Sequence, residues 1–158
     1  MWWRLARSEF MKNRGERNKK ALKSVVDSGK VPGIIAFAQG EPIGWCAVAP
    51  RNEYPTLERS RILKRIGDEP VWSVVCFFVA KKFRRRGITV KLLHSAINHA
   101  KQHGGKIVEG YPIEPTKART PDPFAYTGLA SAFRKAGFAE VARRSKTRPV
   151  MRYQIGKS

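Results

Sequence analysis

The segment from Val71 to Ala100 constrains the fold most, because it joins two elements of different hydrophobic period through a basic turn. Its apolar run, residues 74–79, is unbroken, which is typical of a strand buried on both faces. After Gly87, apolar residues recur three or four positions apart, which predicts one face of a helix. A turn that leads into a helix leaves several backbone N–H groups free at the positive end of the helix dipole. The segment therefore predicts a strand–turn–helix unit that can bind a pyrophosphate.

The turn in this segment resembles the phosphate loop of the GCN5-related N-acetyltransferase (GNAT) family, whose pattern is Gln/Arg-x-x-Gly-x-Gly/Ala. Arg84, Gly87 and Thr89 stand at the three defined positions, and Thr89 departs from the small residue expected there. In order and spacing, the resemblance covers most of the chain from Gly33 onward. It implies that acetyl-CoA is the cofactor and that its pyrophosphate is wrapped by Arg84, Arg85, Arg86, Gly87, Ile88 and Thr89.

In this family, the strand before the turn binds the remaining parts of acetyl-CoA, the pantetheine arm and the thioester. The resemblance implies that backbone groups of Phe77, Phe78 and Val79 hold the pantetheine arm and polarise the thioester. It also implies a splay between this strand and the next one, through which the donor enters. The side chains of the three residues are expected to matter mainly for packing.

The remaining chain alternates between helical and strand patterns. We expect helices over residues 2–11, 16–28 and 129–136, a short one within 51–67, and a proline-rich loop over 112–123. Further strands are expected over residues 34–38, 43–49, 106–111, 138–143 and 150–155. This order predicts one α/β (α+β) domain over residues 1–158, with a mixed, mostly antiparallel sheet between helices. The family normally opens with a strand, and nothing before Trp2 supplies one.

Composition restricts the class of protein. A hydrophobic fraction of 42% is that of a globular chain, and no apolar run approaches the length of a membrane span. The first 20 residues lack the apolar core of a secretory signal, so we expect a cytoplasmic protein without membrane contact. The formal net charge of +20 exceeds what coenzyme A calls for. Two explanations of this charge therefore stay open: a polyanion or RNA partner, or a generally basic surface without a specific partner.

The sequence favours no metal site. Cys46 and Cys76 each lie inside an apolar run, which predicts buried, reduced thiols. The histidines all fall on the helix after Gly87, where a solvated face is expected, and no acidic ligand follows them: His94, His99 and His103.

The general acid of the family is missing from its usual position. The last helix of the family often reads Asn-x-x-Ala-x-x-Phe-Tyr-x-x-x-Gly-Phe, and its tyrosine commonly protonates the leaving thiolate. Alignment on Gly137-Phe138 places Phe133 at the tyrosine and Tyr126 at the asparagine. Tyr126 is then the nearest phenol and our candidate for the catalytic acid. Three alternatives remain: Tyr126 packs on the core, Ser131 serves instead, or the thiolate leaves without an acid.

Candidates for the catalytic base and the acceptor pocket are carboxylates and phenols. Glu109 lies on the strand that should flank the acetyl group, and Tyr111 shares its face by alternation. We expect Glu109 to take the amine proton and Tyr111 to contact substrate, the alternative being a salt-bridged or solvent-facing glutamate. Tyr54 and Glu58 are expected to line the acceptor pocket, or else to belong to a polar surface loop.

The resulting functional prediction is an N-acetyltransferase that moves the acetyl group of acetyl-CoA to a primary amine. Direct transfer in a ternary complex is favoured, because the buried thiol of Cys76 would be a poor nucleophile. The acceptor is a small-molecule or peptide amine. Two alternatives keep the fold: a transferase for an RNA-linked amine, which predicts one continuous basic face, and an acetyl-CoA-binding module with weakened catalysis. A homodimer is expected only by analogy with the family.

Overall fold

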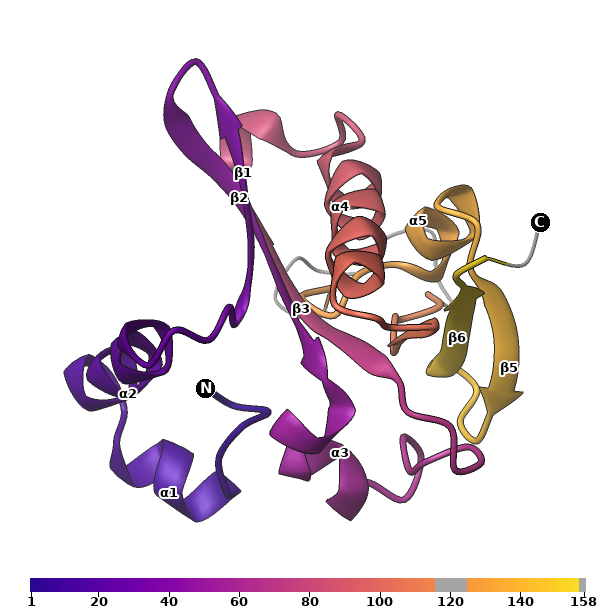
Figure 1. Ribbon diagram of the computed structural model, residues 1–158, viewed down its shortest axis with the longest axis horizontal. Helices are drawn as coiled ribbons and strands as arrows, with labels where there is room; N and C mark the ends of the chain where they lie inside the picture. Colours follow the sequence, from indigo (N-terminus) through magenta and orange to yellow (C-terminus); the bar gives the residue numbers. More distant parts are fainter. Residues whose placement is uncertain (116–124, 157–158) are drawn as a thin grey trace.

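The computed structural model describes residues 1–115 and 125–156 of the chain, which form a sheet with helices on both faces (Figure 1). The six strands lie in the order β1-β2-β3-β4-β6-β5. They are β1 (Gly33–Ala38), β2 (Glu41–Pro50), β3 (Trp72–Val79), β4 (Ile107–Gly110), β5 (Ala139–Arg143) and β6 (Pro149–Gln154). Neighbouring strands are antiparallel except for the parallel pair β3–β4. The predicted mixed, mostly antiparallel sheet is thereby confirmed.

The helices divide into two groups. α4 (Ile88–Gln102) and α5 (Ala130–Lys135) cover one face of the sheet, and α1 (Arg7–Lys12) and α2 (Glu16–Asp27) stand beyond the other (Figure 1). α3 (Pro55–Arg59) follows a single 3₁₀ turn, η1 (Arg51–Glu53), and a second such turn, η2 (Lys81–Phe83), leads from β3 towards α4. In the described ranges, no helix is both long and apolar enough to cross a bilayer.

β3 forms the centre of the sheet because its side chains serve two separate cores. Val74 and Phe77 pack with α4 in the first core. Val75 and Cys76 belong to the second core, on the opposite face. Two successive residues share this face because β3 carries a β-bulge there, which the unbroken apolar run of the sequence does not reveal. The prediction of a strand buried on both faces is confirmed for residues 74–77 and is wrong at Phe78, whose side chain is exposed.

The predicted helix over residues 2–11 is wrong in its first half. The chain makes a turn there, in which the amides of Arg4 and Leu5 donate to the carbonyl of Met1. Trp3 is buried in the second core, and the ring of Trp2 meets Phe10 edge-on at 5.3 Å. Burial of the large indole decides the local conformation, and α1 starts only where the chain leaves the core.

Candidate active site

A gap opens between β3 and β4 part-way along the two strands. They pair in parallel only over Trp72, Ser73 and Val74, which face residues 108–110. Val75, the next residue, is the extra residue of the bulge against β2. A bulge at this position re-aims the remainder of β3 and ends its pairing with β4. The last residues of β3 thus have an edge that β4 does not cover.

The backbone of β3 alternates between the gap and β2. The amide of Phe77 donates across the gap to the carbonyl of Tyr126 at 2.6 Å, and the amide of Ala80 donates to β2 at 2.9 Å. By alternation, Val79 faces the gap with Phe77, whereas the backbone of Phe78 faces β2. Of the three residues predicted to bind a donor through their backbone, two therefore point into the gap.

A cavity of about 290 Å³ lies at this gap, and we call it the strand cavity. Phe77, Phe78 and Val79 line it from β3, and Leu129 and Tyr126 line it from the segment before α5. The side chain of Phe78 is 58% exposed, although it is large and apolar. An exposed aromatic ring beside a polar backbone edge suits a ligand with a long, mostly apolar arm.

A second cavity of about 340 Å³, the loop cavity, adjoins the first at the start of α4. Five of the six residues predicted to wrap a pyrophosphate line it: Arg84, Arg85, Gly87, Ile88 and Thr89. Arg86 does not, and its guanidinium instead lies 5.7 Å from the centroid of the Phe83 ring. Because the first amides of α4 have no partner within the helix, this end of α4 carries a partial positive charge.

Two residues of the loop have left-handed backbones. Gly87 (φ 74°) precedes α4, and a Cβ added there would meet no protein atom within 4 Å, so its backbone conformation rather than crowding by the protein calls for glycine. Arg85 (φ 60°) adopts this region without being glycine. Arg84 is tied back to the strand, because its Nε donates to the carbonyl of Val79 at 3.0 Å.

Two further polar residues of the loop cavity come from α5, which sequence reasoning did not assign to the phosphate loop. Ser131 and Lys135 line the cavity opposite the start of α4. Their spacing of four residues puts them on one face of α5, and this spacing is the only signal in the sequence. Lys135 adds a cation to a cavity that already has Arg84 and Arg85 in its wall.

Tyr126, the candidate acid, lines the strand cavity and is 38% exposed. Burial raises the pKa of its hydroxyl, and the nearby guanidinium of Arg148 partly opposes this effect. The phenol is therefore protonated at neutral pH and has a proton to give. Phe133, at the position of the family's tyrosine, is completely buried, with its ring edge-on to Phe77 at 6.0 Å and to Phe138 at 5.0 Å.

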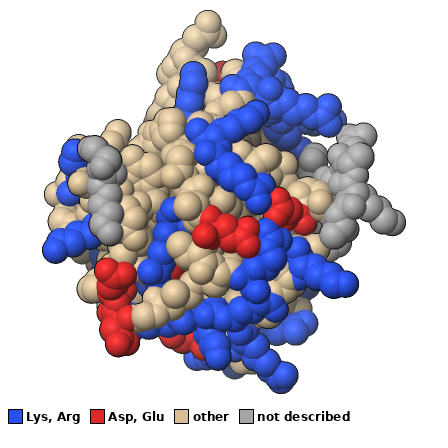
Figure 2. Space-filling view, turned by 90° about the vertical axis from the view of Figure 1, so that its right-hand side faces the viewer, with Lys and Arg blue, Asp and Glu red and all other residues tan. Residues whose placement is uncertain are grey.

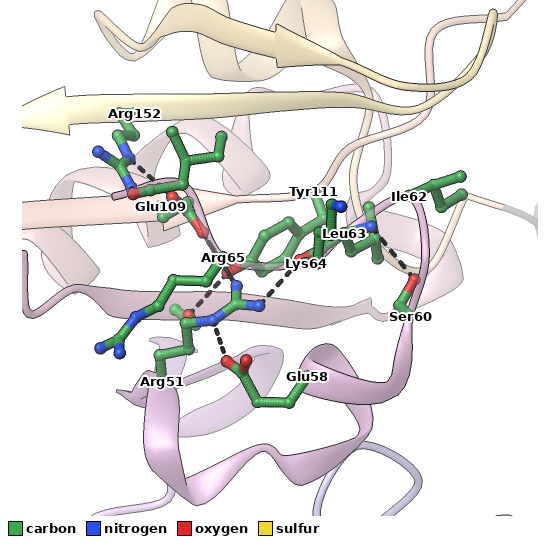
Figure 3. Close-up of polar contacts among 12 residues, drawn as sticks. Arg51, Glu58, Ser60, Ile62, Leu63, Lys64, Arg65, Glu109, Tyr111 and Arg152 are labelled. Carbon is green, nitrogen blue, oxygen red and sulfur yellow. Dashed lines mark hydrogen bonds and ion pairs between the residues drawn. The ribbon is translucent and has the colours of Figure 1, made fainter. Parts of the chain in front are cut away.

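Glu109, the candidate base, lies in a buried ionic cluster (Figure 3). Its Oε1 accepts hydrogen bonds from Arg51 at 3.1 Å and from the Tyr111 hydroxyl at 2.7 Å. Its Oε2 accepts one from Arg152 at 2.6 Å. The carboxylate is 1% exposed and lines neither the strand cavity nor the loop cavity. This geometry matches the salt-bridged alternative.

The three residues predicted to contact the substrate lie in two different places. Tyr111 belongs to the ionic cluster, where burial and the charge of Glu109 raise the pKa of its hydroxyl. Glu58 accepts a hydrogen bond from Arg51 at 2.6 Å at the outer end of the same cluster. Tyr54 lies at a cavity of about 250 Å³ on the face of the sheet opposite α4. We call it the aromatic cavity, and Trp3 and Tyr126 also line it.

Neither cysteine is arranged for metal binding or nucleophilic attack. Burial raises the pKa of the thiols of Cys46 and Cys76, which keeps both protonated at neutral pH. Within residues 1–115 and 125–156, no three potential metal ligands gather at one point.

Comparison with known proteins places this arrangement in a family. Residues 1–113 match the model of the acetyltransferase (GNAT) family. A solved structure from Desulfovibrio desulfuricans, assigned as a GNAT acetyltransferase, is 14% identical with a TM-score of 0.58, and the match covers 94% of this chain and 89% of that one. A Salmonella typhimurium protein assigned as an acetyltransferase, solved with its cofactor acetyl-CoA, is 15% identical with a TM-score of 0.58 over 91% and 76%.

A third similar structure is the ribosomal-protein-alanine N-acetyltransferase from Brucella melitensis, 17% identical, with a TM-score of 0.56 over 89% of this chain and 78% of that one. At these identities the three likenesses establish the fold. No curated protein matches the sequence. Because the family model spans well over half of the residues, this chain belongs to the acetyltransferase (GNAT) family.

Proposed function

We propose that the protein transfers the acetyl group of acetyl-CoA directly to a primary amine in a ternary complex. The observation that carries this proposal is the continuity of the strand cavity with the loop cavity. Val79, Arg84 and Thr89 line both of them. One ligand with an extended arm and a pyrophosphate can therefore occupy the two together. The acetyl-CoA held by the structurally similar Salmonella protein supports this assignment.

In the proposed complex, the pyrophosphate lies at the loop cavity. The free amides at the start of α4 donate to it, and Arg85 and Lys135 contribute positive charge. The pantetheine arm runs along the open edge of β3, where Val79 offers its amide. The thioester then reaches Phe77, whose amide polarises the acetyl carbonyl once it has left the carbonyl of Tyr126.

The transfer step follows from these positions. A neutral amine attacks the polarised carbonyl, a tetrahedral intermediate forms, and the C–S bond breaks as the thiolate leaves. The protonated phenol of Tyr126 supplies the proton that the thiolate takes up, and the proton that the amine nitrogen loses as the amide forms returns to the phenolate through solvent. The protonated thiols of Cys46 and Cys76 favour this direct route over an acetyl-enzyme.

The donor site is tested by calorimetric titration with acetyl-CoA at near-physiological salt. The wild type is expected to bind one equivalent, and Gly87→Asp is expected to abolish binding, because the added carboxylate repels the pyrophosphate. Gly29→Asp is the matched control, since Gly29 is also left-handed (φ 81°) with no atom within 4 Å of an added Cβ. Absence of binding by the folded wild type would overturn the proposal.

A second candidate function is an acetyl-CoA-binding module with weakened catalysis. It is favoured by two observations: Phe133 stands where the family has its acid, and the carboxylate of Glu109 is enclosed by Arg51 and Arg152. Release of free coenzyme A thiol, measured over a panel of primary amines, separates the two functions. Turnover supports the transferase, and binding of acetyl-CoA without turnover on any amine supports the module.

A further inference from the structure

Resting on the proposed acetyl transfer, we infer that the aromatic cavity is the acceptor pocket and that it takes a free α-amino acid with an apolar side chain. In this assignment, the aromatic walls hold the side chain of the amino acid. The guanidinium of Arg4, the indole N–H of Trp3 and the hydroxyl of Tyr54 bind its α-carboxylate.

The position of the aromatic cavity suits an acceptor. Val75 and Cys76 line it from β3, directly before Phe77, whose amide faces the gap. Tyr126 lines both this cavity and the strand cavity. An amine in the aromatic cavity therefore lies on the far side of the gap from α4, next to the segment of β3 where the thioester is expected. Donor and acceptor reach the same point from opposite faces of the sheet.

The walls of the cavity indicate a small molecule with an apolar body. Aromatic and aliphatic side chains form most of the surface, including Trp2, Phe10, Leu22 and Trp45. The volume of about 250 Å³ lies below the range of typical ligand pockets, roughly 300–1,000 Å³, so an amino acid fits and a folded partner does not. None of the lining residues is an aspartate or a glutamate, which disfavours a polycationic amine.

Three buried polar atoms around this cavity have no well-formed hydrogen bond within the described part of the chain: the Nε1 of Trp3, the Nη2 of Arg4 and the hydroxyl of Tyr54. The phenol oxygen of Tyr54 interacts with the guanidinium of Arg4, so the phenol proton stays available to donate. Trp3 is 8% exposed and Tyr54 is 1% exposed. Buried polar groups in native proteins are almost always satisfied, so donors without an acceptor beside a cavity are suited to bind an acceptor group of a ligand.

The hydrogen-bonding capacity of the three groups favours a negatively charged ligand group that can accept several hydrogen bonds. The indole N–H and the guanidinium can only donate hydrogen bonds, and the phenol can also donate one. The Nη1 of Arg4 pairs with Glu53, which leaves the Nη2 on the other arm of the planar fork. The guanidinium lies 4.7 Å from the centroid of the Tyr54 ring, so two of the donors are close together. A carboxylate has the lone pairs to accept from all three.

The cavity also favours a reactive amine. The α-amino group of Met1, one of its lining residues, has a pKa that burial lowers. Desolvation acts in the same way on any amine held there, and it increases the neutral fraction that can attack a thioester. An α-amino group is suited to this effect, because its pKa in solution is already lower than that of a lysine side chain.

The test compares amines that differ in one group, by the release of free thiol from acetyl-CoA. We expect kcat/KM for L-phenylalanine to exceed that for phenethylamine, which lacks the carboxylate, by about tenfold or more. L-Phenylalaninamide is expected to resemble phenethylamine, and spermidine to be the poorest acceptor. Faster turnover of spermidine or phenethylamine, or equal turnover of L-phenylalanine and its amide, would overturn the inference.

Variants assign the preference to the proposed residues. Arg4→Met is expected to reduce the ratio of L-phenylalanine to phenethylamine to near one through KM, with the affinity for acetyl-CoA unchanged. Tyr54→Phe removes only a hydroxyl and should reduce the ratio severalfold, which provides a second test if Arg4→Met does not fold. Arg7→Met is the control, because Arg7 is exposed and does not line the cavity. An unchanged ratio in folded Arg4→Met and Tyr54→Phe would contradict the assignment.

A binding measurement keeps this inference separate from the proposed function. Calorimetric titration of the protein with L-phenylalanine in the presence of coenzyme A reports on the pocket without any reaction. Binding that is lost in Arg4→Met supports the acceptor pocket even if no acetyl group is transferred, in which case the transferase proposal alone fails. Absence of binding to L-phenylalanine by a wild type that binds coenzyme A overturns the inference and leaves the donor site intact.

Discussion

The carboxylate of Glu109 is the anion on which two buried arginines depend. Arg51 is 3% exposed and Arg152 is 8% exposed, and each donates to a different oxygen of Glu109. Both guanidiniums also reach backbone carbonyls, those of Leu63 and Ile66 respectively. One carboxylate therefore anchors the 60–67 segment to β4 and β6 through two cations.

We expect Glu109→Gln to lower the free energy of unfolding by about 3 kcal/mol, because it removes the buried counter-charge of two buried guanidiniums and leaves Arg51 with the half-exposed Glu58 and Arg152 with the exposed Glu69. Urea unfolding monitored by circular dichroism measures the change. Glu41→Gln is the control: Glu41 pairs with Lys82 on the surface, where both side chains are 69% exposed, and should lose under about 1 kcal/mol. A Glu109→Gln protein of native stability without acetyl transfer would instead indicate a catalytic base.

At the scale of elements, α5 packs directly against β4 beside the gap. Gly110 is the last residue of β4 and lies at the point where β3 and β4 separate. A Cβ at this position would lie 2.1 Å from Cε1 of Phe133, so the ring of α5 rests directly on the glycine. The absence of a side chain at Gly110 lets α5 approach the strand and close one wall of the strand cavity.

Gly110→Ala is expected to destabilise the protein by about 1–3 kcal/mol through overpacking against Phe133. Because the two positions touch, adding Phe133→Leu should recover part of the loss, and a double-mutant cycle of unfolding free energies measures this coupling. Gly44→Ala is the control, since the nearest atoms to its added Cβ are 3.3 Å away and its effect should be smaller. Strict additivity of the two changes would contradict the packing described.

The sequence predicted the elements that carry their own periodic signal. The apolar run of β3, the amphipathic face of α4 and the glycine before it specified the strand–turn–helix unit that lines the strand cavity and the loop cavity. The bulge at Val75 was hidden, because it arises from pairing with β2 rather than from the residues of β3 alone. The sequence could not decide between a catalytic and a salt-bridged Glu109 for a similar reason: its partners, Arg51 and Arg152, lie 58 and 43 residues away along the chain.

The aromatic cavity was the least predictable part of the site. Its buried polar groups come from Trp3, Arg4 and Tyr54, which two separate segments supply. Helical periodicity favoured a helix through Trp3, and only tertiary burial places its indole beside Tyr54.

At the scale of the whole molecule, Figure 2 shows one face on which basic side chains are interspersed with acidic ones. On the face in Figure 2, Lys and Arg side chains occupy the top and much of the lower half, with Asp and Glu side chains between them. Some of the basic side chains form ion pairs with acidic side chains of the same chain. Glu114, for example, pairs with Arg134 of α5 and Arg143 of β5 and so ties the segment after β4 to both elements. This face does not have the continuous basic surface that an RNA-directed transferase predicts.

The ion pairs of Glu114 give stability a defined dependence on pH. Hydrogen bonds from Arg134 and Arg143 lower the pKa of its carboxyl to about 2. Because the folded-state pKa lies below the unfolded value, the stabilisation is present above about pH 4.5 and is lost as pH falls towards 2. Unfolding free energies measured across this window should decline less steeply for Glu114→Gln than for the wild type. Parallel curves would show that the pairs do not contribute.

The hydrogen bond between the amide of Phe77 and the carbonyl of Tyr126 has a consequence for product inhibition. In the proposed complex, the acetyl oxygen takes this amide from Tyr126, so one hydrogen bond replaces another. The acetyl group then adds little net affinity, and acetyl-CoA and coenzyme A should bind about equally well. Each turnover would leave behind a competitor as strong as the donor. The rate in the cell would follow the ratio of acetylated to free coenzyme A rather than the concentration of acetyl-CoA alone.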